Sequence, residues 1–196
     1  MLRIDAIRES LLLQNLAFPP YAFRPGLAAV AMVLAGDDSH LELCFIRRAE
    51  REGDPWSGHM AFPGGRASLH DKSAQAAAER EANEEVGLVL GDSLLIGRLP
   101  ELPVHRAGID TGLLLCPFVY YLGLEPAALI PNHEVAWASW IDLNYLWDER
   151  NKTELNLVYN DVPMVFPAIR FRDQLIWGLT MRVLSSFGEV IGVPLV

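Results

Sequence analysis

The stretch FPGGRASLHDKSAQAAAEREANEEVGL, residues 62–88, decides the fold of this 196-residue chain. From Ser73 to Val86 it is rich in alanine and glutamate, residues that favour a helix. Ser73 is a typical helix start, and Gly87 is a typical helix stop. Just upstream, Gly64 and Gly65 carry no side chain, so the backbone there can approach a neighbouring element closely. The stretch therefore predicts a glycine loop followed by a helix.

Three glutamates gather on one face of this predicted helix. Glu81, Glu84 and Glu85 stand at positions i, i+3 and i+4, and at about 100° per residue these positions face the same way. Like charges at this spacing destabilise a helix by roughly a few tenths of a kcal/mol each, a cost that a bound divalent cation would offset. Carboxylate oxygens without a cysteine or histidine cluster favour Mg²⁺ or Mn²⁺ over zinc. Such a cation can activate water and neutralise a diphosphate, which predicts phosphoanhydride hydrolysis.

Small side chains and one arginine complete the predicted site. Ala74, Ala77 and Ala78 fall near the same helix face and leave room for the Gly64–Gly65 loop. Arg80, beside that face, can tie the loop down through its planar group of donors. A solvated helix with acidic residues is the alternative interpretation. The combination of Arg-Glu-x-x-Glu-Glu-x-Gly with FPGG upstream is too rare by chance to favour it.

The remainder of the chain alternates strand-like and helix-like patterns. Gly26–Ala35 and Leu41–Arg48 predict a hairpin around the turn at Gly36–Asp38. A late amphipathic helix is predicted over Gln174–Phe187. Further strands are predicted at Leu94–Leu99, Gly112–Leu122, Val135–Asp142, Leu155–Tyr159 and Met164–Phe171. Strands interspersed with an early, a central and a late helix indicate an α/β sandwich, in which helices cover both faces of a mixed β-sheet.

Length and composition indicate one domain that spans residues 1–196. At 196 residues and 51% hydrophobic, the chain can bury one substantial core. No apolar run approaches the roughly 20 residues that cross a bilayer, so we expect no membrane partner. Near the N-terminus, Ile4, Ile7, Leu11 and Leu12 recur at helical spacing between charged residues. This pattern predicts an amphipathic helix on the core rather than a signal peptide.

Cysteine usage and net charge restrict the compartment and the partners. Cys44 and Cys116 each lie in an apolar run with no CxxC or histidine nearby, which predicts buried free thiols and a reducing cytoplasm. The formal net charge of −9 argues against nucleic-acid binding, which relies on many Lys and Arg side chains. An anionic small-molecule substrate would need metal ions and a local basic patch to offset this charge.

A family resemblance rests on the same stretch. Arg80 to Leu88 reads Arg-Glu-Ala-Asn-Glu-Glu-Val-Gly-Leu after an upstream Gly-Gly pair, and it resembles the Nudix box, whose common form is G-x5-E-x7-R-E-U-x-E-E-x-G-U with U aliphatic. The resemblance implies a Nudix-type α/β/α sandwich with a mixed β-sheet and pyrophosphohydrolase activity. It implies that Glu81, Glu84 and Glu85 bind the metal with help from a glycine carbonyl, assigned here to Gly65. It also implies that Arg80 braces the loop.

One departure from the common box points to a branch of the family. Lys72 occupies the strict register of the first box carboxylate, and Asp71 stands one residue earlier. An Asp with one extra residue is similar to the coenzyme A pyrophosphatase branch, which also favours G-x-(V/M)-A-F-P-G-G upstream. Gly58 and residues 60–65 match that pattern, and residues 176–180 resemble the final helix of that branch.

Catalytic and substrate roles follow from the box and its neighbours. We assign catalytic roles to Glu81, Glu84 and Arg80. By resemblance, Glu134, just before a predicted strand, is a further carboxylate that helps to bind metal or to accept a proton, with simple surface exposure as the alternative. Candidate contacts to substrate phosphates are Arg47, Arg48, Arg51, Arg66 and Gly64, with ordinary surface arginines as the alternative interpretation.

Several histidines and tryptophans have two interpretations. His105, in the predicted long loop PVHRAGIDTG, is either a substrate contact or a solvated loop residue, and His133 is interpreted as a loop histidine. Trp137 and Trp140 can stack on a nucleobase, but residues three apart point to opposite sides of a strand, which places at least one in the core. Trp177 is expected to pack on the apolar face of the last helix.

Hydrolysis of coenzyme A or acyl-coenzyme A to 3′,5′-ADP and (acyl-)4′-phosphopantetheine is the leading hypothesis, with Mg²⁺ or Mn²⁺ as cofactor. The first alternative is a pyrophosphatase for a nucleoside-diphosphate sugar, a dinucleotide or an oxidised nucleotide. The second, motivated by Lys72, is a non-catalytic Nudix-fold binding module. A homodimer is common among relatives, but the sequence contains no exposed hydrophobic pattern that establishes one.

Overall fold

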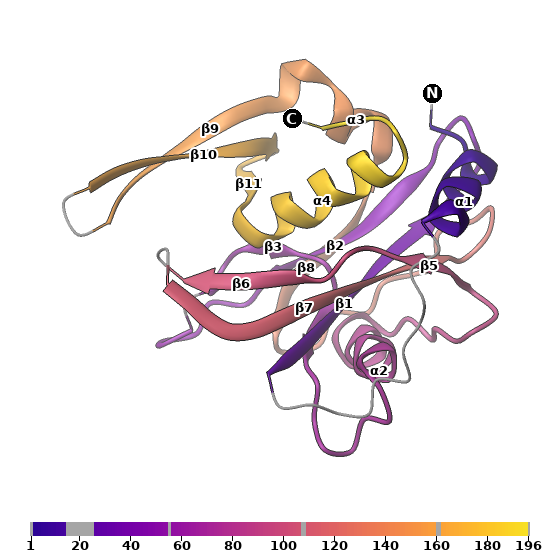
Figure 1. Ribbon diagram of the computed structural model, residues 1–196, viewed down its shortest axis with the longest axis horizontal. Coiled ribbons are helices and arrows are strands. Elements are labelled where there is room, and N and C mark those ends of the chain that lie inside the picture. Colours follow the sequence, from indigo (N-terminus) through magenta and orange to yellow (C-terminus); the bar gives the residue numbers. More distant parts are fainter. Residues whose placement is uncertain (1, 15–25, 55, 107–108, 160–161, 196) are drawn as a thin grey trace.

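A mixed β-sheet forms the centre of the computed structural model, which describes residues 2–14, 26–54, 56–106, 109–159 and 162–195. Within those residues the sheet has eight strands, and helices lie on both of its faces (Figure 1). The predicted α/β class is confirmed. The strands are β1 (Leu27–Ala35), β2 (Glu42–Arg48), β3 (Met60–Ala61), β4 (Gly64–Arg66), β5 (Leu95–Arg98), β6 (Leu102–Arg106), β7 (Ile109–Tyr121) and β8 (Val135–Asp142).

Strand β1 lies at the centre of the sheet. It pairs with β7 in parallel, from Leu27 opposite Leu114 to Leu34 opposite Tyr121. Its partners β2 and β4 are antiparallel, and so are the other pairings of the sheet. The predicted hairpin of β1 and β2 is confirmed. The sequence LAAVAMVLA is almost continuously apolar because both faces of β1 are covered.

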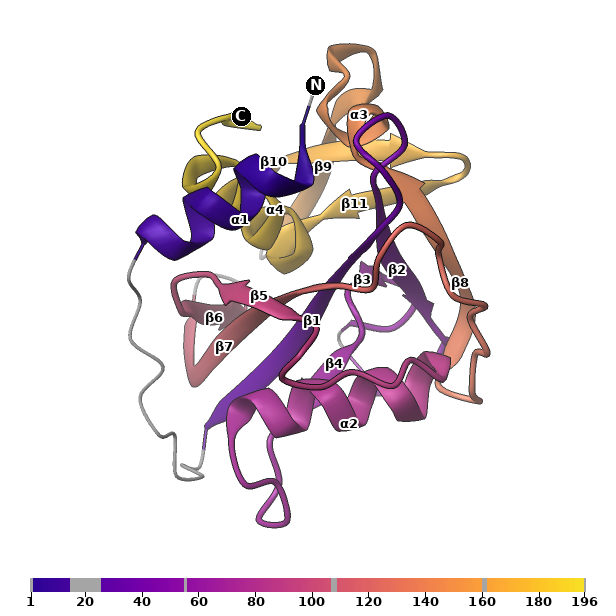
Figure 2. The same cartoon turned by 90° about the vertical axis from the view of Figure 1, so that its right-hand side faces the viewer.

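Alternate residues of β1 serve two different layers of the core. Ala29, Ala31 and Val33 face α2 (Ala74–Val86), which lies beneath the sheet. They share a core cluster with several alanines of that helix. Met32 and Leu34 face the opposite layer, which contains α1 (Ile4–Leu13) and α4 (Gly178–Val190). Figure 2 shows α2 on one side of the sheet and α1 and α4 on the other side. The period of two along a strand produces this division.

Helix α1 buries fewer of its apolar side chains than predicted. Ile7 and Leu11 are buried, as expected from their spacing. Leu12 is 75% exposed, so the prediction that it packs on the core was wrong. Among the described residues, no helix combines the length and the apolar character needed to cross a bilayer. Cys44 and Cys116 are buried and form no disulfide among the described residues, as predicted.

The predicted helix over Gln174–Phe187 was wrong in its first turn. Gln174–Trp177 forms strand β11, which pairs with β10 (Val162–Phe171), and α4 begins only at Gly178. Gly178 has a φ of +63°, a left-handed conformation that lets the chain turn from strand into helix. With β9 (Lys152–Tyr159), these strands form a separate three-stranded sheet in the order β11-β10-β9.

Two further segments differ from the sequence-based expectation. The segment expected to be a long loop around His105 contains β6, which pairs with the first half of β7, and residues 107–108 lie outside the described part. After β8, a short helix α3 (Leu143–Trp147) and a 3-10 turn η1 (Glu149–Asn151) lead into β9. Asp142 caps α3, since its Oδ1 accepts from the Asn144 N–H at 2.6 Å.

Candidate active site

Helix α2 carries the acidic residues and is held close to the sheet. Ser73 Oγ accepts from the Ala76 N–H at 3.0 Å at the start of the helix. Gly87 ends the helix in a left-handed conformation with a φ of +73°. Ala77 and Ala78 are fully buried against the sheet, and their small side chains let the helix axis come near it. The predicted helix and both of its boundaries are confirmed.

Gly64 and Gly65 lie between α2 and β1. They belong to the short strand β4, with Gly65 opposite Ala29, so the predicted loop is in fact a strand at this point. A Cβ atom on Gly64 would collide with the Ala29 carbonyl oxygen. A Cβ on Gly65 would lie 2.5 Å from Glu81 Oε1. Gly64 therefore requires glycine because the backbone of β1 lies too close for a side chain, whereas a side chain at position 65 would displace the Glu81 carboxylate.

Glu85 is the most deeply buried of the acidic side chains. It is 2% exposed, and its Oε2 accepts from the Gly64 N–H at 2.8 Å. Burial raises the pKa of Glu85 to about 8, and this hydrogen bond opposes the shift. A nearby positive charge stabilises the ionised form of a buried carboxylate. Arg48 supplies one such charge, which also lowers the pKa of Glu85.

Glu81 and Glu84 share a single guanidinium nitrogen. Arg80 Nη1 donates to Glu81 Oε1 at 2.8 Å and to Glu84 Oε2 at 2.9 Å. Glu81 is half-buried, and burial raises its pKa, whereas the Arg80 bond lowers it. The Glu84 side chain is 53% exposed. One positively charged atom therefore reaches both carboxylates from a single position.

Arg80 also binds the segment before the helix. Its Nε donates to Asp71 Oδ1 at 2.9 Å, and its Nη2 donates to Asp71 Oδ2 at 3.1 Å and to the Arg66 carbonyl at 3.4 Å. These bonds hold the pKa of Asp71 down at about 2. Asp71 is buried and Lys72 is exposed. The acidic residue that faces the site is thus the one outside the strict box register.

Glu134 comes from a distant part of the chain and lies near the same group. It precedes β8, its side chain is 45% exposed, and its Oε1 lies 3.7 Å from Arg51 Nη1. Its negative charge contributes to raising the pKa of both Glu81 and Glu85. The fold therefore brings Glu134 close to the α2 carboxylates.

The donor atoms suit a hard divalent cation. Among the described residues, no three Asp, Glu, His or Cys side chains are arranged as a complete metal site. Arg80 engages Glu81 and Glu84, and Gly64 engages Glu85, so each carboxylate has a hydrogen-bond partner. The donors available here are oxygens alone, and the close approach of Gly65 to Glu81 brings backbone beside them. Such an oxygen-only set suits a hard divalent cation.

A cavity of about 380 Å³ opens beside Gly64 and Gly65. Three arginines, Arg48, Arg51 and Arg66, are among its lining residues, together with Asp54. Apolar side chains from the β6–β7 hairpin and α4 also line it, namely Val104, Leu113, Leu115, Leu179 and Val183. The cavity therefore combines cationic and apolar side chains.

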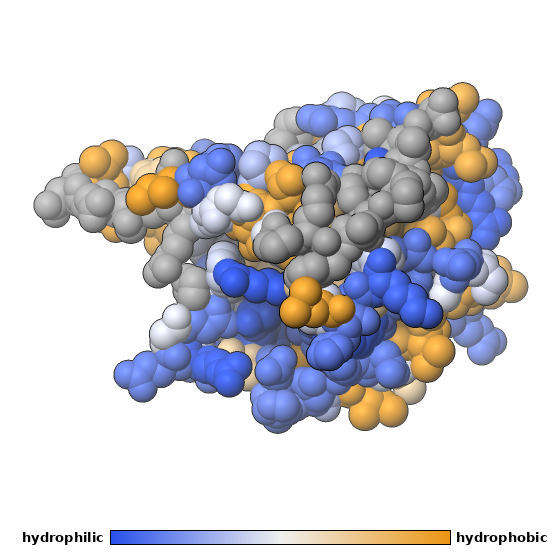
Figure 3. All heavy atoms as spheres, turned by 60° about the horizontal axis from the view of Figure 1, so that its bottom comes forward, coloured by the Kyte–Doolittle hydropathy of each residue, from blue (hydrophilic) through white to orange (hydrophobic). Residues whose placement is uncertain are grey.

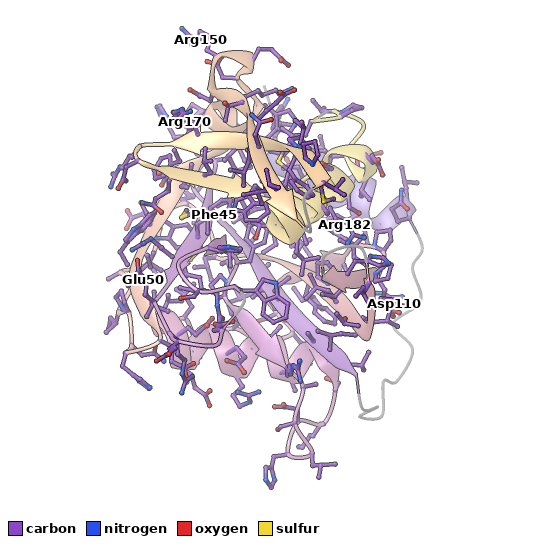
Figure 4. All side chains as sticks on the ribbon, turned by 90° about the vertical axis from the view of Figure 1, so that its left-hand side faces the viewer. Phe45, Glu50, Asp110, Arg150, Arg170 and Arg182 are labelled. Atoms are coloured by element: carbon purple, nitrogen blue, oxygen red, sulfur yellow. The ribbon has the colours of Figure 1, made fainter. Side chains whose placement is uncertain are left out.

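The predicted arginines take different positions. Arg48 lines the cavity and donates from Nη2 to Asp54 Oδ2 at 2.7 Å, while its buried Nε has no partner among the described residues. Arg47 donates to Glu50 Oε1 at 3.0 Å and does not line the cavity. Figure 4 shows Glu50 at the outer edge of the molecule, while Phe45, on the same strand as Arg47, lies in the interior. Arg48 and Arg66 are thus better placed than Arg47 to meet a phosphate.

Trp177 and His59 were not recognised as site residues from the sequence. Trp177 lies at the end of β11 and lines the cavity, so the expectation that it belongs to the last helix was wrong. Its ring centroid lies 4.8 Å from that of His59. Burial lowers the pKa of His59, which keeps the ring neutral near neutral pH. The available signal was Gly178, a helix-start glycine that separates Trp177 from the helix.

The other aromatic and histidine interpretations have mixed outcomes. Trp137 and Trp140 face the two opposite layers of the core, as predicted. His105 is exposed, but it lies in β6 rather than in a loop, and His133 is exposed before β8.

Comparisons with known proteins agree with this geometry. The sequence profile of the NUDIX domain matches residues 25–160. An uncharacterized protein of Schizosaccharomyces pombe is 42% identical over 101 residues, which is 50% of this chain and 31% of that protein. The uncharacterized Nudix hydrolase NudL of Photorhabdus laumondii is 30% identical over 145 residues, which is 70% of this chain and 71% of the relative. This chain thus spans about a third of the first relative and over two thirds of the second.

A solved structure shares the fold. A MutT/nudix family protein from Enterococcus faecalis superimposes with a TM-score of 0.59 and 20% identity, covering 94% of this chain and 69% of the other. Together with relatives named as Nudix hydrolases, the family match supports the expectation of a pyrophosphohydrolase. On its sequence, its box and its fold, this chain belongs to the Nudix family.

Proposed function

We propose that this chain hydrolyses the diphosphate linkage of coenzyme A or an acyl-coenzyme A, with Mg²⁺ or Mn²⁺, to 3′,5′-ADP and (acyl-)4′-phosphopantetheine. One observation carries the proposal. The Gly64–Gly65 backbone, which contacts Glu85 and approaches Glu81, lines a cavity whose walls combine arginines with many apolar side chains. A diphosphate with an apolar extension matches that combination of surfaces.

The arginines of the cavity lining suit the phosphates. Arg48 and Arg66 line the cavity together with Gly64, and Arg48 has a buried Nε without a partner among the described residues. Guanidinium groups bind phosphate through charged, often bidentate hydrogen bonds. Local positive charge is needed here because the chain as a whole carries a formal net charge of −9.

The apolar part of the lining favours a pantetheine or acyl group over a second nucleotide. The side chains of Val104, Leu113, Leu115, Leu179 and Val183 form no hydrogen bonds. Thr180 lines the cavity, but its Oγ1 donates to the Met60 carbonyl at 2.8 Å. A nucleobase placed against these walls would leave polar edge atoms unpaired, at about 1–3 kcal/mol each. An alkyl or pantetheine chain carries fewer such groups.

The acidic group would bind the cation and position water. We propose Glu81, Glu84 and Glu85 as its ligands, with the Gly65 carbonyl beside them. A divalent cation there would neutralise the diphosphate and lower the pKa of a bound water. Glu134, which precedes β8, is proposed to accept a proton. Arg80 is proposed to hold the site in position through its bonds to Asp71 and to the Arg66 carbonyl.

A substrate panel tests this proposal. Coenzyme A, ADP-ribose, NADH and diadenosine polyphosphates would each be incubated with Mg²⁺ or Mn²⁺, and the products would be resolved by chromatography. Release of 3′,5′-ADP from coenzyme A with the highest kcat/KM is the expected result. A higher kcat/KM for another substrate would keep the reaction class and reject the coenzyme A assignment.

The same substrate panel tests two alternative functions. A pyrophosphatase for another nucleoside-diphosphate derivative would prefer a substrate with two polar halves. A non-catalytic binding module, suggested by Lys72 in the box register, would bind nucleotides without turnover. Retained metal-dependent hydrolysis of any diphosphate would rule out the module.

We also propose a single domain, a small-molecule nucleotide substrate, no nucleic-acid partner and a cytoplasmic location. Cys44 and Cys116, which are buried and form no disulfide among the described residues, support a reducing compartment. The formal net charge of −9 supports the absence of a nucleic-acid partner.

A further inference from the structure

The pairing of the strands orders the residues that line the cavity. Arg66 of β4 stands opposite Ala28 of β1, and Ala28 stands opposite Leu115 of β7, so these side chains share the face of the sheet that α4 covers. Strand β6 pairs with the other side of β7, with Val104 opposite Leu113. Neighbouring strands lie about 4.8 Å apart, so the three spacings from β4 to β6 span roughly 14 Å. The lining therefore runs from Arg66 on one side to Val104 on the other.

The two sides of the cavity differ in exposure. Arg66 is exposed on the β4 side. Val104 and Leu115 are only 1% and 4% exposed although both line the cavity, and Val183 of α4, which also lines it, is 1% exposed. A cavity whose lining is exposed on one side and buried on the other opens on the exposed side. The lining thus indicates a mouth at β4 and a closed end between β6 and α4.

Helix α4 is attached to the sheet on both sides of the cavity. Thr180 Oγ1 donates to the Met60 carbonyl at 2.8 Å, and Arg182 Nη1 donates to the Pro103 carbonyl at 2.8 Å. Met60 lies in β3 and Pro103 lies in β6, and these strands are on opposite sides of β1 (Figure 1). The two bonds hold α4 over the closed end. A group too long for the cavity would therefore meet packed side chains, which tolerate added volume poorly.

Strand β4 lies between the acidic group of α2 and the cavity. A Cβ on Gly65 would meet the Glu81 carboxylate, and the Gly64 N–H binds Glu85 Oε2, whereas Gly64 and Arg66 also line the cavity. The side of the molecule that carries α2 is mostly hydrophilic (Figure 3). A diphosphate bound at β4 would therefore find its apolar surroundings inside the cavity rather than on the surface around α2.

We infer that the closed end of the cavity limits the length of the substrate beyond its diphosphate, so that the chain acts on free coenzyme A and short acyl-coenzyme A and discriminates against long acyl chains. The inference rests on the proposed hydrolysis of coenzyme A. The diphosphate lies at β4, the pantetheine arm crosses β1 and β7 beneath α4, and its thiol end meets Val104 and Val183. A long acyl chain on that thiol has no space beyond these two side chains.

Steady-state kinetics on coenzyme A, acetyl-coenzyme A and octanoyl-coenzyme A with Mg²⁺ or Mn²⁺ test the inference. The kcat/KM for octanoyl-coenzyme A is expected to be at least about tenfold below that for coenzyme A, because its methylene groups would have to enter packed side chains. An equal or higher kcat/KM for octanoyl-coenzyme A would overturn the inference and leave the proposed hydrolysis standing. No hydrolysis of any of the three would reject the proposed function itself, and the inference with it.

Two variants at the closed end make the test specific to the cavity. Val183→Ala and Val104→Ala each remove bulk there, one from α4 and one from β6. Each is expected to raise the ratio of kcat/KM for octanoyl-coenzyme A to that for coenzyme A at least about threefold, since even one methylene in an apolar pocket can be worth tenfold or more. Val190→Ala is the matched control, because it makes the same change on α4 at a residue that does not line the cavity.

The ratio measured for Val190→Ala is expected to equal that of the unchanged chain. Because the measured quantity is a ratio between two substrates, a general loss of stability or of active protein cancels from it. A ratio that stays unchanged in both Val183→Ala and Val104→Ala would overturn the inference, because the closed end would then not set the limit on length.

Discussion

The α2 site and the β9–β10 hairpin differ in whether their polar groups have partners within the described part of the chain. At the site, Arg80 alone engages Asp71, Glu81 and Glu84, so side chains of opposite charge bind one another within the chain. On the hairpin, Val158 is 73% exposed, and β9 is the outer strand of its sheet, so no described strand pairs with its outer edge. The site would exchange internal ion pairs for a cation and phosphates, whereas the hairpin has no part in that exchange.

Removal of the most buried charge at the site should have the largest effect. Glu85→Gln is expected to lower kcat/KM at least about a thousandfold, the scale expected when a metal site is dismantled. Steady-state kinetics with Mg²⁺ or Mn²⁺ on the preferred diphosphate would measure it. Glu79→Gln is the matched control on the same helix, because it makes the same chemical change away from Gly64. Activity retained by Glu85→Gln would show that Glu85 is not a metal ligand.

Loss of the close backbone approach should have the next largest effect. Gly65→Ala would place a methyl group 2.5 Å from Glu81 Oε1, so the carboxylate or β4 must shift. Displacements of about 1 Å at a reacting centre cost roughly a hundredfold in rate, and a loss of that size in kcat/KM is expected. Gly53→Ala tests alanine at a glycine with no atom near its Cβ position. An unimpaired Gly65→Ala enzyme would mean that the approach of Gly65 to Glu81 does not matter for catalysis.

The Arg80–Asp71 pair should govern stability more than the hairpin does. Asp71→Asn is expected to cost about 2 kcal/mol of unfolding free energy near pH 7, from the lowering of the Asp71 pKa. The folded pKa lies below the unfolded value, so this contribution is present above the unfolded pKa of 3.8 and is lost as pH falls towards about 2. Denaturant unfolding of both proteins as a function of pH would measure it. A stability difference that stays constant down to that pH would contradict the assigned ion pair.

The smallest expected effect concerns the cavity wall that connects to the hairpin. Trp177→Ala removes the ring that packs against both His59 and Phe166. It is expected to raise KM about tenfold and to change kcat little, because the ring contacts bound substrate far from the reacting phosphorus. Kinetics on coenzyme A would separate KM from kcat, and Trp140→Phe, on the other core layer, serves as the control. A fall in kcat alone would place Trp177 nearer the chemistry than proposed here.

Local patterns were enough to predict much of the fold and part of the site. The boundaries of α2 followed from Ser73 and Gly87, because capping depends on residues next to the helix. The hairpin of β1 and β2 followed from two apolar runs around a glycine turn. The arrangement of Arg80 with the glutamates followed from helical spacing, which holds wherever the helix packs.

Other features were decided by pairing partners far away in the sequence. Gln174–Trp177 reads as helix by its apolar spacing, but β10 offers it a strand edge, and that pairing outweighs local preference. The segment around His105 became a strand because β7 runs beside it. Trp177 and His59, 118 positions apart by their residue numbers, meet only because β11 and α4 close over the sheet.

The sequence by itself determined the helix with its acidic face, the glycine pair before it and the family to which the chain belongs. These features depend on spacing within a few residues, and covalent geometry sets that spacing. The tertiary structure alone decided which arginines reach the cavity, that Asp71 rather than Lys72 faces Arg80, and that β9 is the outer strand of its sheet. These depend on packing between distant segments, where burial and pairing compete with local preference.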